Sequence, residues 1–133
     1  MESSCKLNGK WQTCLYNPDH VVIKTKSFNQ ISMNATEIQQ VIQVQPLTTY
    51  IKSTNDFQDY KSGVFDTSEC ESLNGDDDIN HALLIVGYGI EKDLPYWLVK
   101  NSWDVTWGEM GYGKVLANVN MCNIEFKQFY PIL

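Results

Sequence analysis

The chain has 133 residues, 43% of them hydrophobic, and a formal net charge of −6. That length fits one domain or half of a two-domain enzyme, and the composition excludes a largely disordered chain. The acidic balance argues against a nucleic-acid partner, and no apolar run approaches the roughly 18 residues of a membrane helix. The polar start from Met1 to Cys5 lacks a signal peptide, which fits a cytosolic protein or a longer chain whose first part is missing.

The cysteines bear on metal binding and on the cellular compartment. They are Cys5, Cys14, Cys70 and Cys122, with no Cys-x-x-Cys pair and only two histidines in the chain. We therefore expect neither a metal site nor a cofactor. Four cysteines allow three disulfide connectivities, and spacing alone does not choose among them. Oxidised cysteines would indicate a secretory, lysosomal or extracellular compartment.

The first twenty residues are rich in turns. Asn8-Gly9 predicts a tight hairpin with Cys5 and Cys14 on its two sides, and Asn17-Pro18-Asp19 predicts a second turn. A bridge between Cys5 and Cys14 is sterically conceivable, although the two cysteines are not strictly opposite in that register.

The next segment predicts an edge strand followed by a helix. Val21 to Phe28 has strand propensity. Asn34 can cap a helix, Glu37 stands at the capping-box position, and Pro46 ends the helix. Asn34-Ala35-Thr36 is also an N-glycosylation sequon. Capping is the favoured role, because such triplets often arise by chance and a glycan would matter only in a secreted protein.

Short elements continue along the chain. Leu47 to Ile51 predicts a strand, Asp56 to Tyr60 one helical turn, and Val64-Phe65 a short strand. Cys70 to Asp78 is a predicted loop that ends in three consecutive aspartates. Such acids usually lie in solvent; alternatively they form a carboxylate field near His81 that would raise its pKa.

A predicted β-hairpin organises the rest of the chain. Its first arm, His81 to Gly89, is almost wholly apolar, which is typical of a strand buried on both faces. Ile90 to Pro95 carries charge and a proline and predicts the turn. The second arm, Tyr96 to Trp103, is aromatic and β-branched at first and then polar.

The hairpin can bring an imidazole beside a carboxamide. If the turn centres near residue 92, His81 lies opposite the neighbourhood of Asn101. A histidine that acts as a general base needs a fixed tautomer and ring plane, which an amide oxygen on one ring nitrogen supplies. The other nitrogen then serves a nucleophile. For an isolated pair, the commoner alternative is a buried histidine with an ordinary hydrogen-bond partner.

The last segments complete a predicted sheet. Trp107 to Gly113 is a glycine-punctuated turn, Gly113 to Val119 a strand, and Cys122 to Leu133 is expected to pack back on the sheet. Short strands with one clear helix predict an α+β fold: an antiparallel, barrel-like sheet with short helices at its rim.

Several motifs stand in a recognisable order. They are Asp56 to Phe65, Asn80-His81-Ala82 with Val86 to Gly89, Lys100 to Trp103 with Trp107 to Gly113, and Phe129-Tyr130-Pro131. Together they resemble the C-terminal half of the papain-like cysteine proteases, the family of papain and the cathepsins. The match runs from about Cys14 to the last residue, and motifs in this order are very improbable by chance.

This resemblance implies roles around the hairpin. His81 would be the general base and the ion-pair partner of a cysteine. Asn101 would orient its ring. Trp103 would shield their hydrogen bond from water and line the leaving-group side of the cleft, and a polar contact is stronger where water is excluded.

The resemblance also implies substrate-binding residues and a disulfide. Tyr50, Ala82 and Lys127 would line the substrate site, with Lys127 near the floor of the main specificity pocket. A lysine there would favour an acidic or polar substrate side chain; equally, its ammonium group could extend to solvent. Cys70 and Cys122 resemble the family's disulfide within this half.

Some positions depart from the family pattern. The family's catalytic cysteine lies in a glycine- and tryptophan-flanked motif of the N-terminal half, and no cysteine here has that context. Asp104 and Thr106 stand where the family usually has glycine, and Asn80 stands where many relatives carry an acid. Cys14 resembles the cysteine that bonds to the other half, which leaves Cys5 without an obvious family partner.

Together these features predict that residues 1–133 form the C-terminal, right-hand domain of a papain-like peptidase, acting through a thiolate–imidazolium pair. The expected partners are a polypeptide substrate and the missing N-terminal half. The chain alone is expected to be inactive, and the compartment lysosomal or extracellular. The alternatives are a non-catalytic relative with a binding or structural role, and a truncated gene product.

Overall fold

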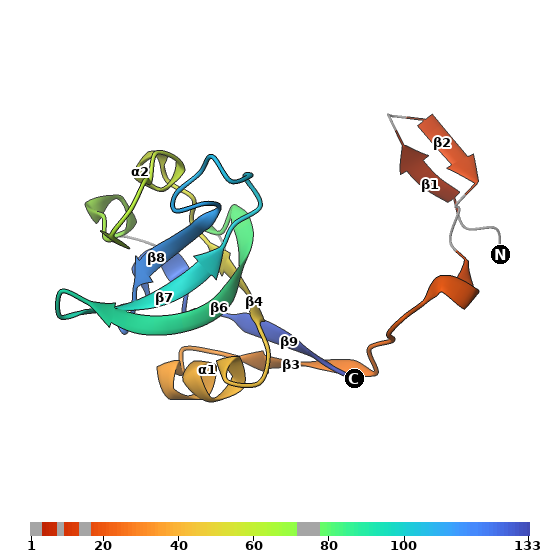
Figure 1. The fold of residues 1–133 in the computed structure, drawn as a ribbon, viewed down its shortest axis with the longest axis horizontal. Coiled ribbons are helices and arrows are strands. Elements are labelled where there is room, and N and C mark those ends of the chain that lie inside the picture. The colour runs from red at the N-terminus through yellow and green to blue at the C-terminus, as the bar shows by residue number, and fades with distance from the viewer. Residues whose placement is uncertain (1–3, 8–9, 14–16, 72–77) are drawn as a thin grey trace.

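The computed structural model describes residues 4–7, 10–13, 17–71 and 78–133. Within these residues, seven strands form one sheet in the order β3-β9-β4-β6-β7-β8-β5 (Figure 1). A separate two-stranded sheet pairs β1 (Ser4–Leu7) with β2 (Lys10–Thr13).

The elements are short, and their bounds follow. The strands of the main sheet are β3 (Ser27–Ile31), β4 (Leu47–Ile51), β5 (Val64–Phe65), β6 (His81–Glu91), β7 (Leu94–Lys100), β8 (Tyr112–Leu116) and β9 (Gln128–Ile132). The helices are α1 (Ala35–Ile42) and α2 (Asn55–Gln58), with 3-10 turns at Pro18–His20, Ser68–Cys70 and Met121–Asn123.

The α+β class is confirmed, and the sheet is open rather than a closed barrel. All neighbouring strands run antiparallel except β5 and β8, which are parallel. Closing a barrel requires the two edge strands to pair along their length. Here the edges are β3 and β5, and β5 has only two residues, both paired with β8.

The core lies on one face of the long hairpin. Leu83 and Ile85 of β6, with Trp97 and Val99 of β7, are buried there, as the period of two predicts. The prediction that the first arm is buried on both faces is wrong, because Leu84 on its other face is 37% exposed. Helix α1 packs against β4 and β6, and its buried Ile38 belongs to the same core.

The turn of this hairpin is tighter than predicted. Glu91 pairs directly with Leu94, so Lys92 and Asp93 alone form the turn, both with positive φ (50° and 66°). Two left-handed central residues define a type I′ turn, whose twist matches that of the flanking strands. A register shift between Ile85 and Gly87 then determines which residues of β6 and β7 face each other at the open end of the hairpin.

Near the N-terminus, the predicted hairpin forms and the predicted edge strand shifts. Leu7 pairs with Lys10, although the turn residues Asn8-Gly9 and also Cys14 lie outside the described residues. Strand β3 is an edge strand but starts at Ser27 rather than at Val21. Its first paired residue, Ser27, lies opposite Ile132 of β9, and the backbone N–H of Lys26 still donates to the Ile132 carbonyl at 2.7 Å.

The C-terminal segment enters the sheet instead of only packing on it. Strand β9 lies between β3 and β4, and Phe129 is paired with both Gln30 and Thr48. A disulfide joins Cys70 to Cys122, with the two Cα atoms 5.0 Å apart. The pairing that the family resemblance implies is therefore present. The first two of the three consecutive aspartates lie outside the described residues.

Candidate active site

The imidazole of His81 and the carboxamide of Asn101 are in direct contact. His81 Nε2 lies 2.8 Å from Asn101 Oδ1, which also accepts the backbone N–H of Ser102 at 2.8 Å. Because a backbone N–H only donates, the atom between them must be the amide oxygen, and Nε2 must carry the proton that reaches it. The neutral ring therefore presents Nδ1 as an acceptor for another group.

The hairpin produces this contact as its two arms separate. His81 is the first residue of β6, and the last regular pair of the hairpin joins Leu84 to Lys100. Asn101 then leaves β7, and its backbone N–H donates to the carbonyl of Gly111 at 3.0 Å. The predicted juxtaposition is thus present at the open end of the hairpin.

Aromatic rings fix the plane of the imidazole. Trp103 stacks on His81 with ring centroids 4.5 Å apart and planes inclined by 29°. Phe57 of α2 meets Trp103 edge-on at 5.8 Å. Trp107 packs on Phe57 at 5.0 Å, and its indole N–H donates to the Phe57 carbonyl at 2.9 Å. The sequence alone did not predict that Phe57 and Trp107 support the Trp103 ring, although both residues lie in the motifs quoted from it.

Comparison with known proteins identifies the family. The profile described as "Papain family cysteine protease" matches residues 1–132 of this chain. The chain belongs to the papain family of cysteine proteases. It is 37% identical to thiol protease aleurain of Arabidopsis thaliana over 134 residues, which cover 99% of this chain and 37% of that protein. It is 38% identical to mouse pro-cathepsin H, covering 98% of this chain and 39% of that protein.

Solved structures share the papain-family fold. Procathepsin L2 proteinase from the larval midgut of Tenebrio molitor matches with a TM-score of 0.82 and 32% identity, over 92% of this chain and 38% of that chain. Bromelain from Ananas comosus, in complex with the E64 inhibitor, matches with a TM-score of 0.71 and 31% identity, over 82% and 51%. This chain therefore spans well under half the length of its curated relatives.

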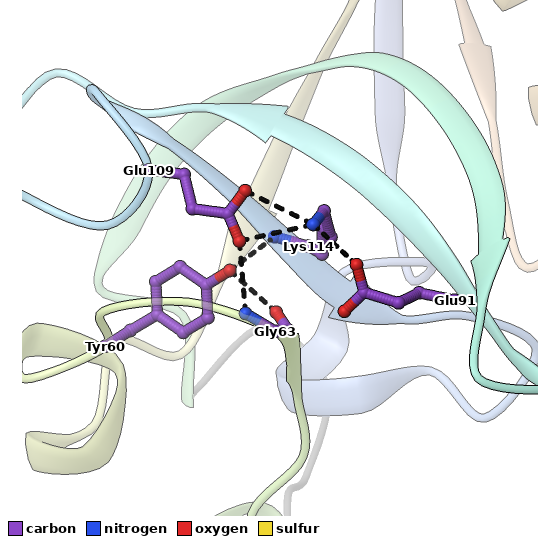
Figure 2. Close-up of polar contacts among 5 residues, drawn as sticks. All are labelled: Tyr60, Gly63, Glu91, Glu109 and Lys114. Atoms are coloured by element: carbon purple, nitrogen blue, oxygen red, sulfur yellow. Dashed lines mark hydrogen bonds and ion pairs between the residues drawn. The ribbon is translucent and has the colours of Figure 1, made fainter.

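A polar network supports the loop that carries Asn101 and Trp103. Figure 2 shows Glu109, from the glycine-rich turn of that loop, accepting the backbone N–H of Gly63 at 3.1 Å and an N–H of Lys114 Nζ at 3.2 Å. Lys114 also donates to Glu91 at 2.8 Å. The Tyr60 hydroxyl donates to the Gly63 carbonyl and accepts the backbone N–H of Lys114. The network therefore ties the loop to the segment after α2 and to the tip of the β6–β7 hairpin.

These contacts shift the ionisation of the network. The N–H of Gly63, followed by Lys114, lowers the pKa of the Glu109 carboxyl below its ordinary 4.5. The hydrogen bond to Glu91, with further support from Glu109, raises the pKa of Lys114 well above its usual range. Burial raises the pKa of Tyr60. All three groups are thus held in the ionisation state that the network uses near neutral pH.

We expect Glu109→Gln to lower the free energy of unfolding at pH 7 but hardly at pH 3. The depressed pKa means that the carboxylate stabilises the fold above about 4.5 and loses this effect as the pH falls through the native pKa. The effect should stay below about 1 kcal/mol, because this side chain is more than one-third exposed. Urea unfolding at both pH values, with exposed Glu71→Gln as the control, measures it. Equal losses at both pH values would contradict the assignment.

Asn80, which stands where many relatives carry an acid, extends the pairing of β4 with β6. Its Oδ1 accepts the backbone N–H of Ser53 at 2.6 Å, and its Nδ2 donates to the Ser53 carbonyl at 3.1 Å. Its own backbone N–H donates to Ile51. The carboxamide thereby fixes the residue that precedes His81, and a carboxylate could not make the donating contact.

Asn80→Asp is expected to cost roughly 0.5–1.5 kcal/mol of stability at pH 7, since a carboxylate would then face the Ser53 carbonyl without a proton to donate, and solvent screens this exposed side chain. The loss should shrink near pH 3, where a protonated aspartate can donate again. Chemical unfolding at the two pH values tests this, with exposed Asn55→Asp as the matched control. A loss that does not depend on pH would count against the proposed geometry.

Asp104, one of the two departures at family glycines, adopts the conformation that glycine favours. Its φ is +67°, and its Oδ1 accepts the backbone N–H of Val105 at 2.6 Å. Aspartate tolerates the left-handed region better than most residues because its short side chain can bond locally. Thr106 is not among the described residues with positive φ, so its β-branched side chain does not have to adopt the left-handed conformation.

Two of the predicted substrate-binding residues, Tyr50 and Ala82, lie close to the open end of the hairpin. Tyr50 and Ala82 are directly paired across β4 and β6, so they share one face of the sheet at the end where β6 begins with His81. Ala82 and Asn101 line a hollow of about 270 Å³. Lys127 is half-buried, with Nζ 5.1 Å from the centroid of the Phe126 ring.

In the part of the chain that the structure describes, no helix is long and apolar enough to cross a membrane. Among the same residues, no group of three histidines, cysteines or acids is placed to hold a metal ion.

Proposed function

We propose that this chain is the histidine-bearing, right-hand half of a cysteine-type peptidase that cleaves polypeptides. The observation that carries the proposal is the contact of His81 with Asn101. It commits Nε2 to an amide oxygen and leaves Nδ1 for a thiol. The papain-family match and the thiol protease relatives support the same reaction class.

In this mechanism, His81 first accepts a proton from the nucleophile and later donates it to the leaving group. Nδ1 takes the proton of the cysteine thiol, and the resulting imidazolium stabilises the thiolate. The thiolate attacks the peptide carbonyl carbon, and the imidazolium then gives its proton to the leaving amine as the acyl–enzyme forms. Water, activated by the same nitrogen, hydrolyses the acyl–enzyme. Asn101 holds the ring in one plane throughout, and Trp103 keeps water from their hydrogen bond.

The nucleophile is proposed to come from a complementary half. Cys70 and Cys122 are joined in a disulfide, so neither supplies a free thiol. The chain covers only 37% of the aleurain relative, which leaves ample length for a nucleophile-bearing half in a protein of that size. We therefore expect residues 1–133 alone to be inactive. A disulfide of this kind also favours a lysosomal or extracellular location.

Substrate recognition is proposed to use the sheet face that carries Tyr50 and Ala82, at the end of β6 where His81 lies. Tyr50 and Ala82 would contact the substrate side chain next to the cleaved bond, with Phe129 supporting Tyr50 edge-on at 5.8 Å. Lys127 would favour an acidic or polar side chain if its ammonium group leaves the Phe126 ring for the pocket.

The test is labelling of the parent protein from its native source with an alkylating active-site thiol probe, followed by intact mass. We expect a mass well above that of this chain and one labelled cysteine outside residues 1–133. A mass equal to this chain, with no label and no peptide turnover, would overturn the proposal and favour a non-catalytic relative. Turnover of a peptide by the purified chain would refute the claim that it is inactive alone.

A further inference from the structure

One motif of the sequence has no part in the proposed chemistry. Asn34-Ala35-Thr36 is the only Asn-x-Ser/Thr triplet in the chain with a residue other than proline at its centre. It stands where the chain passes from β3 into α1, and both Asn34 and Thr36 are exposed. An acceptor asparagine has to be reachable at the surface, and this one is.

The oxygen and the nitrogen of the Asn34 side-chain amide make different contacts. Oδ1 accepts the backbone N–H of Glu37 at 3.1 Å, which caps the first turn of α1. Nδ2 points to the side of this cap, with Glu37 Oε2 at 3.4 Å. A glycan attaches to Nδ2 and leaves the carbonyl oxygen in place, so a glycosylated Asn34 keeps its capping bond. Capping and glycosylation are therefore compatible, and Asn34 can serve both roles.

The surroundings leave room for a bulky group. Met33, which precedes the acceptor, has a left-handed φ of 49° and is 65% exposed. The anchors of the segment, Ile31 and Ile38, are buried on either side of it. In Figure 1, α1 lies on the opposite side of the molecule from α2, whose Phe57 packs beside the active-site rings. A glycan on Asn34 would thus leave the His81 face open.

We propose that Asn34 is an N-glycosylation site. Nδ2 forms a bond to C1 of the first sugar of a lipid-linked oligosaccharide diphosphate. The bond from C1 to the diphosphate oxygen breaks, the lipid diphosphate leaves with the electron pair, and Nδ2 loses one proton. No oxidant or reductant is required. The disulfide between Cys70 and Cys122 is the kind of bond that forms and persists in the secretory pathway, where this transfer takes place.

The direct test uses the protein purified from the cells that make it. Trypsin cleaves after Lys26 and Lys52, so peptide 27–52 contains Asn34 as its only acceptor. An amidase that releases N-glycans, used in water labelled with heavy oxygen, converts a glycosylated asparagine to labelled aspartate. We expect labelled aspartate at position 34 in most copies of the peptide. Recovery of the peptide with unmodified asparagine alone would overturn the proposal.

Two variants of the full-length protein separate glycosylation from capping. Thr36→Ala removes the sequon but leaves the Asn34 cap, and alanine is a good helix former. Thr36→Ser keeps the sequon. We expect Thr36→Ala to lose the mass of one glycan while Thr36→Ser retains it, and enzymatic deglycosylation should make the two equal except for the substituted side chains. Equal glycan mass in the untreated variants would contradict the assignment. The result does not depend on the peptidase activity.

Discussion

Replacing His81 by alanine in the full-length protein is expected to lower kcat for a peptide substrate by about 10³-fold or more. General acid–base catalysis contributes about 10²–10⁴-fold, and here the same ring also activates the nucleophile. KM should change much less, because the imidazole acts on the reacting atoms rather than on the substrate's side chains. Steady-state kinetics with a fluorogenic peptide measures both constants.

The chain offers a matched control in its only other histidine. His20 lies exposed on the first 3-10 turn, and His20→Ala should leave kcat unchanged. Asn101→Ala should lower kcat by about 10- to 100-fold, less than the loss of the base itself, because the ring survives but is no longer held. If His81→Ala retains wild-type kcat, the proposed mechanism is wrong.

The hairpin and its histidine–asparagine contact could be predicted because the pattern is local. Strand β4 matches its predicted bounds, Leu47 to Ile51, and His81 and Asn101 meet because a single turn relates them. The helix cap at Asn34 was predictable for the same reason, since the capping oxygen reaches only three residues along the chain.

The sheet's open edge and the burial of β6 could not be predicted in the same way. Both depend on which strands pair over long separations, such as Thr48 with Phe129. The apolar run at the start of β6 predicts burial on two faces, yet Leu84 remains 37% exposed because the described chain packs its core against one face only. Composition along one strand does not reveal what covers it.

The polar contacts that support the site could not be predicted from the sequence either. Glu109 receives an N–H from Gly63, 46 residues away, and Asn80 bonds both backbone groups of Ser53, 27 residues away. Each of these side chains looks like an ordinary surface polar residue in the sequence. Only the fold shows that Asn80 fixes the residue before His81 and that Glu109 ties the loop after Asn101 to the segment at Gly63.

Glu125 is the strongest example of such a hidden contact, and its replacement should have the largest effect on stability. The side chain is only 7% exposed. Its Oε1 accepts the indole N–H of Trp97 at 2.7 Å and the backbone N–H of Asn118, and its Oε2 accepts the backbone N–H of Asn120 at 3.1 Å. Asn118 and Asn120 both have positive φ. One carboxylate thus holds a left-handed loop against the centre of the core.

We expect Glu125→Leu to lower the free energy of unfolding by roughly 3–5 kcal/mol, because the buried indole N–H of Trp97 and two partly buried backbone N–H groups lose their carboxylate acceptor. Glu125→Gln, which keeps the shape but turns one acceptor into a donor, should cost roughly 1–3 kcal/mol. Urea unfolding followed by tryptophan fluorescence measures both, with exposed Glu71→Leu as the control. Losses that match this control would mean that the three N–H groups find other partners.

A double-mutant cycle with Trp97→Phe separates the indole contact from the backbone contacts. Phenylalanine keeps an aromatic ring in the core but removes the N–H that reaches Glu125. If the carboxylate mainly serves the indole, Glu125→Gln should cost far less in the Trp97→Phe background, with a coupling of about 1–3 kcal/mol. If it mainly holds the loop at Asn118 and Asn120, the two losses should add. We expect partial coupling, because the carboxylate accepts from both groups, and full additivity would assign its role to the loop alone.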